Sequence, residues 1–258
     1  MITFSIITCT YNASAVIERT LRSVLCQSYP HIEHVIVDGC SKDDTIAKVR
    51  SYEALSMAKH ASRAINIICE KDNGLYDAMN KGINRATGDY VIFLNAGDMF
   101  SSDDILETVA AQIKEGDTLP GVIYGNTNIV DEDGNFLRER RLSPPENLTW
   151  RSFRHGMLVC HQSFYALSSI AKQTPYDLSY RLSADVDWCI RVMKKAESEK
   201  RSLHNTHLTL CSYLDGGMSV QNHRASLKER FCIMSKHYGL LSTAIMHLWF
   251  VFRAILKK

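Results

Sequence analysis

Hydrophobic and polar positions follow two rhythms along the first half of the chain. Between short apolar runs, apolar residues recur every three or four positions, as on one face of a helix, for example at Ile17, Leu21 and Val24. The runs themselves are nearly continuous, which is typical of strands buried on both faces. They lie at residues 2–8, 34–38, 65–69 and 90–94. Strands that alternate with helices indicate a largely parallel sheet covered by helices on both faces, so we predict an α/β fold.

The second half of the chain has a less regular pattern. Pro144 and Pro145 predict the start of a short helix. Longer amphipathic helices are indicated at residues 186–196 and 224–238, and the acidic, glycine-containing segment 131–135 reads as a hairpin turn. Short apolar stretches predict further strands at residues 121–124, 128–130, 158–160, 164–166 and 208–213.

The last segment, residues 240–258, is apolar almost throughout but carries Trp249, Arg253, Lys257 and Lys258. It is short for a membrane span. An amphipathic helix with aromatic and basic anchors at a membrane surface fits this pattern. The alternative is a terminal helix that packs on the protein's own core or on a second subunit, as in a homodimer.

Composition adds constraints on partners and compartment. The formal net charge of the 258 residues is only +2, so the whole protein has no attraction for nucleic acid, and we expect no nucleic-acid partner. The eight cysteines form no CxxC pair, and we expect small buried side chains in a reducing compartment rather than zinc ligands. The first residues lack the basic region and long apolar core of a signal peptide, which predicts a cytoplasmic protein.

Polar residues follow the predicted strands at their carboxyl ends, where ligands bind in parallel sheets. Asp98 could hold Mg²⁺ or Mn²⁺ together with phosphate oxygens, and Asp38 could accept from a nucleotide base or ribose. A helix cap or a turn is the ordinary alternative for each aspartate. The full set of candidates for binding is Thr10, Asn12, Asp38, Asp72, Gly74, Asp77, Lys81 and Asp98.

Three further candidates lie downstream. Asp185 and Asp187 are two positions apart at the start of a predicted helix, a spacing that points their side chains in different directions. One could therefore face a site while the other stabilises the helix N-terminus. His161 is a candidate for substrate binding, although its apolar neighbours are also typical of a core histidine. The sequence contains no GxGxxG, GxxxxGK[ST] or GxSxG motif.

The order of these motifs resembles that of family 2 glycosyltransferases with the GT-A fold. The resemblance covers roughly residues 1–220 and is strongest to bacterial enzymes that build capsule, O-antigen or exopolysaccharide repeat units. The matching stretches are residues 5–12, 37–45, 72–82, 93–98, 183–188 and 216–219. The resemblance implies the nucleotide-diphospho-sugar transferase fold, with a mostly parallel central sheet, flanking helices and a C-terminal helical tail.

The resemblance also implies roles for individual residues. Thr10 and Asp38 would contact the nucleotide base or ribose, and Asp72 would belong to the same donor-binding group. Asp98 would be the metal ligand that remains of the DXD motif, with diphosphate and water supplying the other ligands. Asp185 would be the catalytic base, with Ala184 in place of the family's adjacent glutamate.

We therefore predict an inverting, metal-dependent glycosyltransferase. It would move a sugar from a nucleotide-diphosphate sugar to a hydroxyl of a glycan or lipid-linked acceptor in cell-surface polysaccharide synthesis. Residues 1–100 would form the nucleotide-sugar half and residues 101–239 the acceptor half of one domain, with 240–258 as a helix in peripheral contact with the inner face of the membrane. The alternatives are a sugar-nucleotide nucleotidyltransferase and a non-catalytic carbohydrate-binding protein of the same fold.

Overall fold

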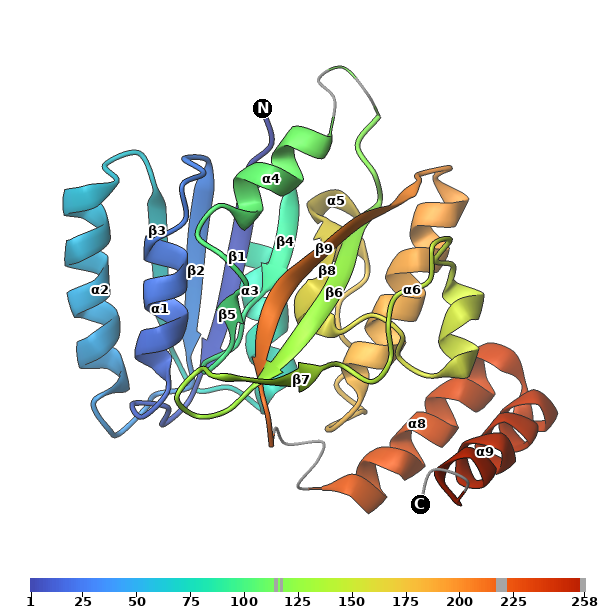
Figure 1. Cartoon of the computed structure of the whole chain (residues 1–258). Coiled ribbons are helices and arrows are strands. Elements are labelled where there is room, and N and C mark those ends of the chain that lie inside the picture. Colours follow the sequence, from blue (N-terminus) through green and yellow to red (C-terminus); the bar gives the residue numbers. More distant parts are fainter. Residues whose placement is uncertain (114–115, 117, 217–221, 256–258) are drawn as a thin grey trace.

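The structure, a computed structural model, describes residues 1–113, 116, 118–216 and 222–255. One central sheet carries helices on both faces (Figure 1). Its strands follow the order β3-β2-β1-β4-β8-β6-β9-β5, and β7 pairs with β6. The predicted α/β fold is confirmed.

The first half of the chain forms the parallel part of the sheet. β1, β2 and β4 are buried at every position, as their continuous apolar runs predict. The strand pairs β1–β2, β2–β3 and β1–β4 are all parallel, so the carboxyl ends of these strands meet at one edge. The elements are β1 (Phe4–Thr10), α1 (Ile17–Leu25), β2 (Ile32–Asp38), α2 (Thr45–Lys59), β3 (Ala64–Cys69), α3 (Leu75–Arg85) and β4 (Tyr90–Phe93).

The second half extends the same sheet with mixed pairing. β8 runs antiparallel to both β4 and β6, whereas β9 is parallel to β6 and antiparallel to β5. The sheet as a whole is therefore mixed. The elements are β5 (Met99–Phe100), α4 (Ile105–Gln112), β6 (Val122–Val130), β7 (Phe136–Glu139), η1 (Trp150–His155), η2 (His161–Ser163), β8 (Phe164–Leu167), α5 (Ser168–Gln173), α6 (Ala184–Ser198), β9 (Leu203–Leu214), α8 (His223–Tyr238) and α9 (Leu240–Ile255).

Three local predictions in the second half are wrong. Residues 121–124 and 128–130 belong to one long strand, β6, rather than two. No helix begins at Pro144, because the Tyr124 hydroxyl bonds the carbonyls of Pro145 and Glu146 and ties this segment to the sheet. Residues 158–160 are not a strand, since the Arg140 guanidinium bonds backbone carbonyls here in place of a neighbouring strand.

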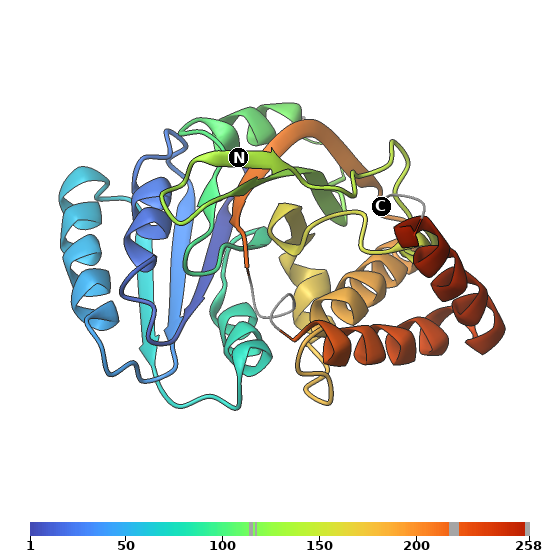
Figure 2. The ribbon, with the colours of Figure 1, turned by 60° about the horizontal axis from the view of Figure 1, so that its bottom comes forward.

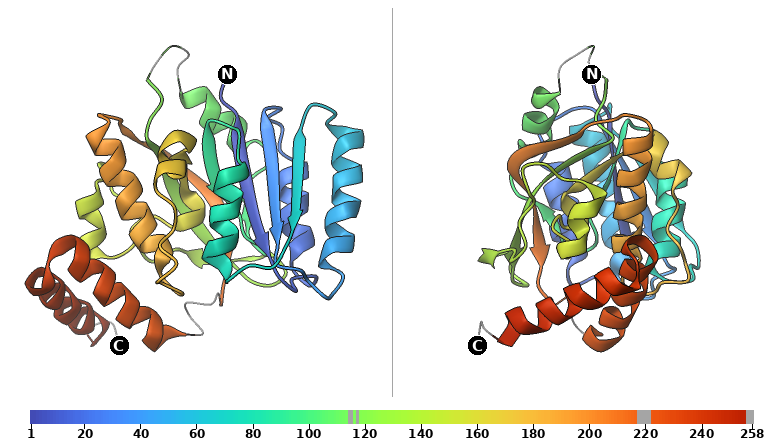
Figure 3. Two further views of the ribbon diagram at one scale, coloured as in Figure 1. Left: turned by 180° about the vertical axis from the view of Figure 1, so that it is seen from behind. Right: turned by 90° about the vertical axis from the view of Figure 1, so that its right-hand side faces the viewer.

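Helices cover both faces of the sheet. Seen from behind, α3, α5 and α6 lie on one face, whereas α1 and α4 lie on the other (Figure 3). α3 lies close against β1 because Gly82 has no side chain there; an added Cβ would overlap Ile7. This contact fixes the helix that begins beside the carboxyl end of β1.

The last two helices, α8 and α9, form an arm beside the sheet (Figure 2). The predicted C-terminal helix is confirmed as far as Ile255; Lys257 and Lys258 lie outside the described residues. Large apolar side chains of α9 are exposed at Leu240, Leu241, Ile245, Leu248, Trp249 and Phe252. Within the described ranges, no helix has the length and apolar character needed to cross a membrane.

Candidate active site

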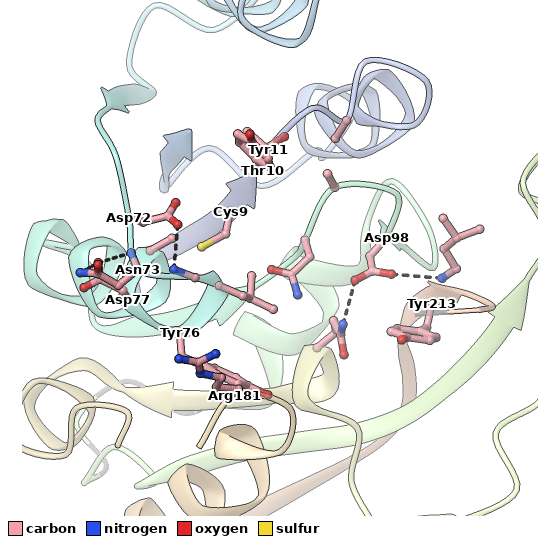
Figure 4. Close-up of a pocket in the computed structure, with 18 of the residues that line it drawn as sticks. Cys9, Thr10, Tyr11, Asp72, Asn73, Tyr76, Asp77, Asp98, Arg181 and Tyr213 are labelled. Carbon is pink, nitrogen blue, oxygen red and sulfur yellow. Dashed lines mark hydrogen bonds between the residues drawn. The ribbon is translucent and has the colours of Figure 1, made fainter. Parts of the chain in front are cut away.

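A pocket of about 900 Å³ opens where the carboxyl ends of β1 and β4 meet the end of β9 (Figure 4). Its wall combines segments that are far apart in the sequence. From the first half come residues 9–11, 13, 72–78, 95, 96 and 98, and from the second half residues 162, 178, 180, 181 and 213–216. Both halves of the chain are therefore needed to form the pocket.

Asp98 lies in the wall of this pocket and is only 3% exposed. Gly97, at φ +100°, makes the left-handed turn that precedes it. The Asp98 Oδ1 atom accepts from the Leu214 backbone N–H at 3.1 Å, and Oδ2 accepts from Gln162 Nε2 at 2.8 Å. Burial raises the pKa of Asp98 to about 7, although these hydrogen bonds oppose the shift.

The turn that carries Asp98 offers a second oxygen. The Asn95 Oδ1 atom is buried and has no hydrogen-bond partner among the described residues, and both residues line the pocket. Among all the residues that the structure describes, no group of three or more His, Cys, Asp or Glu side chains could hold a metal ion. A divalent cation that keeps phosphate and water ligands needs only one or two protein oxygens, so Asp98 and Asn95 fit such an ion.

The loop between β3 and α3 forms the next part of the wall. Asp72 Oδ1 accepts from the Gly74 N–H at 2.9 Å, and Asp77 Oδ2 accepts from the Asn73 N–H at 2.9 Å. Gly74, at φ +110°, allows the turn between them. The two aspartates thus fix the loop backbone and line the pocket at the same time.

The first turn of α6 brings Asp185 into contact with a residue of the pocket wall. Tyr76, which lines the pocket, donates from its hydroxyl to Asp185 Oδ1 at 3.3 Å. Burial and the Asp185 charge raise the pKa of Tyr76 well above its usual value, so the phenol stays protonated and donates. Asp185 is therefore a carboxylate beside the pocket, oriented by a neutral donor.

Asp187 points away from the pocket and is fully buried. It accepts from Arg191 Nε at 2.6 Å and bonds His237 Nε2 at 2.8 Å, with Lys236 Nζ at 3.7 Å. Burial alone would raise the pKa of Asp187, but the hydrogen bonds from His237 and Arg191 and the neighbouring positive charges outweigh it and hold the pKa at about 2. The two aspartates therefore face different surroundings, as their spacing predicts.

The sequence model of the family described as "Glycosyl transferase family 2" matches residues 5–172. A "PGL/p-HBAD biosynthesis glycosyltransferase" of Mycobacterium tuberculosis is 33% identical over 218 residues, which are 84% of this chain and 78% of that protein. The chain belongs to glycosyl transferase family 2. The predicted resemblance is thereby confirmed.

Solved glycosyltransferases share the fold of this family 2 chain. The structure of S. aureus TarS 1-349 in complex with UDP-GlcNAc has a TM-score of 0.68 at 18% identity and covers 95% of this chain, which spans 66% of that one. The mannosyltransferase PcManGT from Pyrobaculum calidifontis, in complex with GDP-Man and Mn²⁺, has a TM-score of 0.65 at 17% identity. The match covers 96% of this chain and 70% of that one. These likenesses confirm the GT-A-type fold.

Not every residue predicted for the family 2 site lines the pocket. Thr10, Asp72, Gly74, Asp77 and Asp98 do, and the buried Thr10 Oγ1 atom has no partner among the described residues. The remaining candidates for binding hold neighbouring loops or the core, and Asp185 bonds the pocket residue Tyr76 without lining the pocket itself.

Asn12, Asp38 and Lys81 hold loops around the pocket. Asn12 Oδ1 accepts from the Lys42 N–H at 2.8 Å. The buried Asp38 carboxylate accepts from the N–H of Ser41 at 2.7 Å and from its hydroxyl, which is the turn role that the local sequence allows. Lys81 Nζ pairs with a Glu70 oxygen at 3.1 Å. Ser41 therefore binds Asp38 instead of capping the following helix.

His161 lies in the core, not in the pocket wall. It is 4% exposed, stacks on Phe93 with ring centroids 4.7 Å apart, and bonds the Tyr176 hydroxyl through Nε2. Burial lowers the pKa of His161 to about 4, so the ring is neutral at pH 7. It is not among the residues that line the pocket.

Several pocket residues had no signal in the sequence. Gln162 and Arg181 acquire their positions only when distant segments meet, and no local motif singles them out. Tyr76 lies within the matching stretch 72–82, but its contact with Asp185 depends on a distant segment. Asn95 lies in the matching stretch 93–98, where the family has an acidic residue. The structure shows that its side-chain oxygen has no hydrogen-bond partner among the described residues. The Gly216–Ser219 match falls mostly outside the described residues, which end at Gly216 and resume at Asn222.

Proposed function

We propose that this family 2 glycosyltransferase is an inverting enzyme. It transfers a sugar from a nucleotide-diphosphate donor to a hydroxyl of a glycan or lipid-linked acceptor in cell-surface polysaccharide synthesis. The observation that carries the proposal is a pocket with a buried carboxylate, Asp98, in one wall and Tyr76 in another, with Asp185 bonded to the Tyr76 hydroxyl. A leaving diphosphate and an attacking hydroxyl need separate partners of these two kinds.

The donor half comprises residues 1–100. Thr10, Asp72, Gly74 and Asp77 would contact the nucleotide and sugar, while Asn12, Asp38 and Lys81 support the loops that present them. The neighbouring structure of PcManGT contains a nucleotide sugar, GDP-Man. An unpartnered Thr10 hydroxyl that lines the pocket supports a polar ligand there.

Asp98 and Asn95 would hold Mg²⁺ or Mn²⁺ through their side-chain oxygens. Such an ion supplies positive charge that stabilises the departing diphosphate. The protein's own contribution is orientation: Gln162 and the Leu214 N–H fix the Asp98 carboxylate. Mn²⁺ is present in the PcManGT complex, which supports a divalent cation for this chain.

The acceptor half comprises residues 101–239. Asp185 would take the proton of the acceptor hydroxyl as its oxygen attacks the anomeric carbon from the side opposite the diphosphate. The bond to the diphosphate breaks as the new glycosidic bond forms, so the configuration inverts and no covalent enzyme intermediate is needed. Tyr76 orients the base by donating to Oδ1.

The proposal is tested by replacing the base. Asp185→Asn keeps the shape of the side chain but cannot accept the proton, so transfer should fall about 10²- to 10⁴-fold while nucleotide binding is retained. The measurement is release of nucleotide diphosphate from a panel of nucleotide sugars with Mg²⁺ or Mn²⁺. Asp187→Asn is the comparison and should cost less transfer, because Asp187 holds α6 in place without accepting the proton. Near-normal transfer by the Asp185 variant would refute its role.

We also propose that the protein works at the inner, cytoplasmic face of the membrane when its acceptor is lipid-linked. The support is the exposed apolar face of α9, on which Leu241, Ile245, Leu248 and Phe252 follow one another at helical spacing. Trp249 lies beside them and is 49% exposed. An apolar helix face of this kind binds lipid surfaces without crossing them.

A further inference from the structure

The pocket holds one cationic side chain among many acidic ones. Within the described part of the chain, Arg181 is the only Lys, Arg or His residue that lines it (Figure 4). Four carboxyl side chains line the same pocket: Asp72, Asp77, Asp98 and Asp215. A cation in such surroundings would be expected to form an ion pair with one of them.

Arg181 forms no such pair. No described residue lies within ion-pair or hydrogen-bond distance of its guanidinium. Two of the acids are engaged with other cations: Asp77 lies 3.8 Å from Lys81, and Asp215 lies 3.2 Å from Arg138. The guanidinium, which is always charged and carries five donors in a planar fork, thus has its charge and its donors available to a ligand.

The backbone around Arg181 is held in place. Glu229 on α8 accepts from three successive N–H groups, those of Arg181 at 2.9 Å, Leu182 at 2.8 Å and Ser183 at 2.9 Å. Two carboxylate oxygens therefore fix the segment that leads into α6. A long side chain on a fixed backbone loses less conformational freedom when it binds a ligand.

The position of Arg181 associates it with the base. It precedes Asp185 by four residues in the segment that enters α6, and Tyr76 joins that helix to the pocket. In Figure 4, Arg181 lies across the pocket from Tyr11 and is well separated from Asp98. The cation therefore lies on the side where the proposed acceptor hydroxyl approaches, and away from the proposed diphosphate position.

We propose that Arg181 binds an anionic group of the acceptor, a phosphate or a carboxylate close to the hydroxyl that attacks. A guanidinium fork bonds either oxyanion through two parallel N–H donors. The acceptor class is therefore an acidic or phosphorylated sugar, and neutral sugars are selected against. This inference rests on the proposed function, because it assigns the acceptor side of the same pocket.

The test measures binding of small probes with the donor site filled. UDP or GDP, whichever raises the melting temperature of the wild type, is added with Mg²⁺ at saturation. Glucose 1-phosphate, glucuronate and methyl glucoside are then titrated by calorimetry. The wild type should bind at least one of the two anions about tenfold more tightly than methyl glucoside; the preferred anion distinguishes phosphate from carboxylate.

Arg181→Gln should remove this preference and leave nucleotide binding unchanged, and Arg181→Lys, which keeps the charge but not the fork, should restore part of it. Arg151→Gln is the matched control, since Arg151 pairs with Glu197 on the surface outside the pocket. An equal preference in wild type and Arg181→Gln would overturn the proposal.

A second result would also overturn it. If Arg181→Gln weakens UDP relative to uridine but leaves the sugar anions unaffected, Arg181 binds the donor diphosphate instead. Failure of the proposed function looks different: neither nucleotide would bind the wild type and no nucleotide sugar would be hydrolysed, whichever residue stands at position 181.

Discussion

Asp98 lies buried in the pocket wall, where its ionised form is destabilised by the loss of contact with water. An exposed carboxylate would not need the two donors that Gln162 and Leu214 supply. A pKa of about 7 means that the folded state holds a proton at pH values where the unfolded chain has already released it. A bound cation would reverse this preference by favouring the ionised form.

A stability measurement follows from this sign. Between about pH 4 and about pH 7, Asp98 is ionised in the unfolded chain but still protonated in the folded one. As the pH rises through this range, Asp98 therefore increasingly lowers the free energy of unfolding, and above about pH 7 the effect is constant. In chelator, Asp98→Asn should therefore raise the melting temperature at pH 8 and change it little at pH 4.5. Mg²⁺ with nucleotide should stabilise the wild type and not the variant.

Asp77→Asn provides the comparison, because it removes a carboxylate from the same pocket without removing a buried one. Equal changes in melting temperature at both pH values for Asp98→Asn would contradict the raised pKa. Equal stabilisation of wild type and variant by Mg²⁺ with nucleotide would contradict the role of Asp98 as a ligand.

The sequence predicted single residues where a local motif was sufficient. Thr10 ends β1, Asp72, Gly74 and Asp98 lie in the loops after β3 and β4, and all four line the pocket. For His161 the sequence left a binding role and a core position open, and only the packing of Phe93 and Tyr176 around the ring shows that it is enclosed. Whether a polar residue faces a pocket or the core depends on partners far away in the chain.

At the scale of elements, α6 and α8 are joined by two groups of charges. At one point Glu229 of α8 binds the backbone that precedes α6, and at another Asp187 of α6 binds Arg191, His237 and Lys236. The first turn of α6 carries Asp185, so these contacts fix the base without touching a ligand. Helix positions are set here by ionic contacts as well as by apolar packing.

Removal of the ionic contacts around Asp187 should lower the stability of the fold, by an amount that depends on pH. The pKa of Asp187 is about 2, below its value of about 4 in the unfolded chain, so its stabilising effect is complete above pH 4 and is lost as the pH falls toward 2. Asp187→Asn should lower the free energy of unfolding by about 2 kcal/mol at pH 7, an amount reduced by the partial exposure of Arg191 and Lys236.

Urea unfolding at pH 7 and pH 3 measures this difference, and it should be smaller at pH 3. Asp177→Asn is a suitable control, because Asp177 also lies near Lys236 but is partly exposed. A loss that is the same at both pH values would show that packing, rather than charge, accounts for the effect of Asp187.

Elements of the first half could be predicted because each is specified locally. The apolar runs of β1, β2 and β4 are buried along their whole length, and the periodic stretches between them form helices. The pairing of β8 between β4 and β6, and of β9 between β6 and β5, depends on contacts between distant segments. No periodicity within a short segment specifies such a neighbour.

At the scale of the whole molecule, the described part of α9 departs from an ordinary polar surface, because six of its large apolar side chains are exposed. Replacing Leu241 and Leu248 with Gln removes apolar area from the centre of this face without shortening the helix. Sedimentation with liposomes that contain phosphatidylglycerol should be lost, while the melting temperature and nucleotide binding are kept.

Leu55→Gln with Met57→Gln is the matched control, because these side chains of α2 are similarly exposed, at 60% and 64%. If the wild type ignores liposomes and instead elutes as a dimer that the α9 variant converts to a monomer, the face binds a second copy. Deletion of residues 240–258 that yields an insoluble chain would show that α9 is needed for the core.

β9 comes last among the strands that the structure describes, yet it lies inside the sheet, between β6 and β5. Its Leu214 N–H reaches back 116 residues to hold Asp98. During synthesis, a nascent chain without β9 therefore has no finished pocket, however well its first strands have folded. Closing such long loops is slow compared with forming local contacts. We therefore expect donor turnover only from a chain in which β9 has joined the sheet.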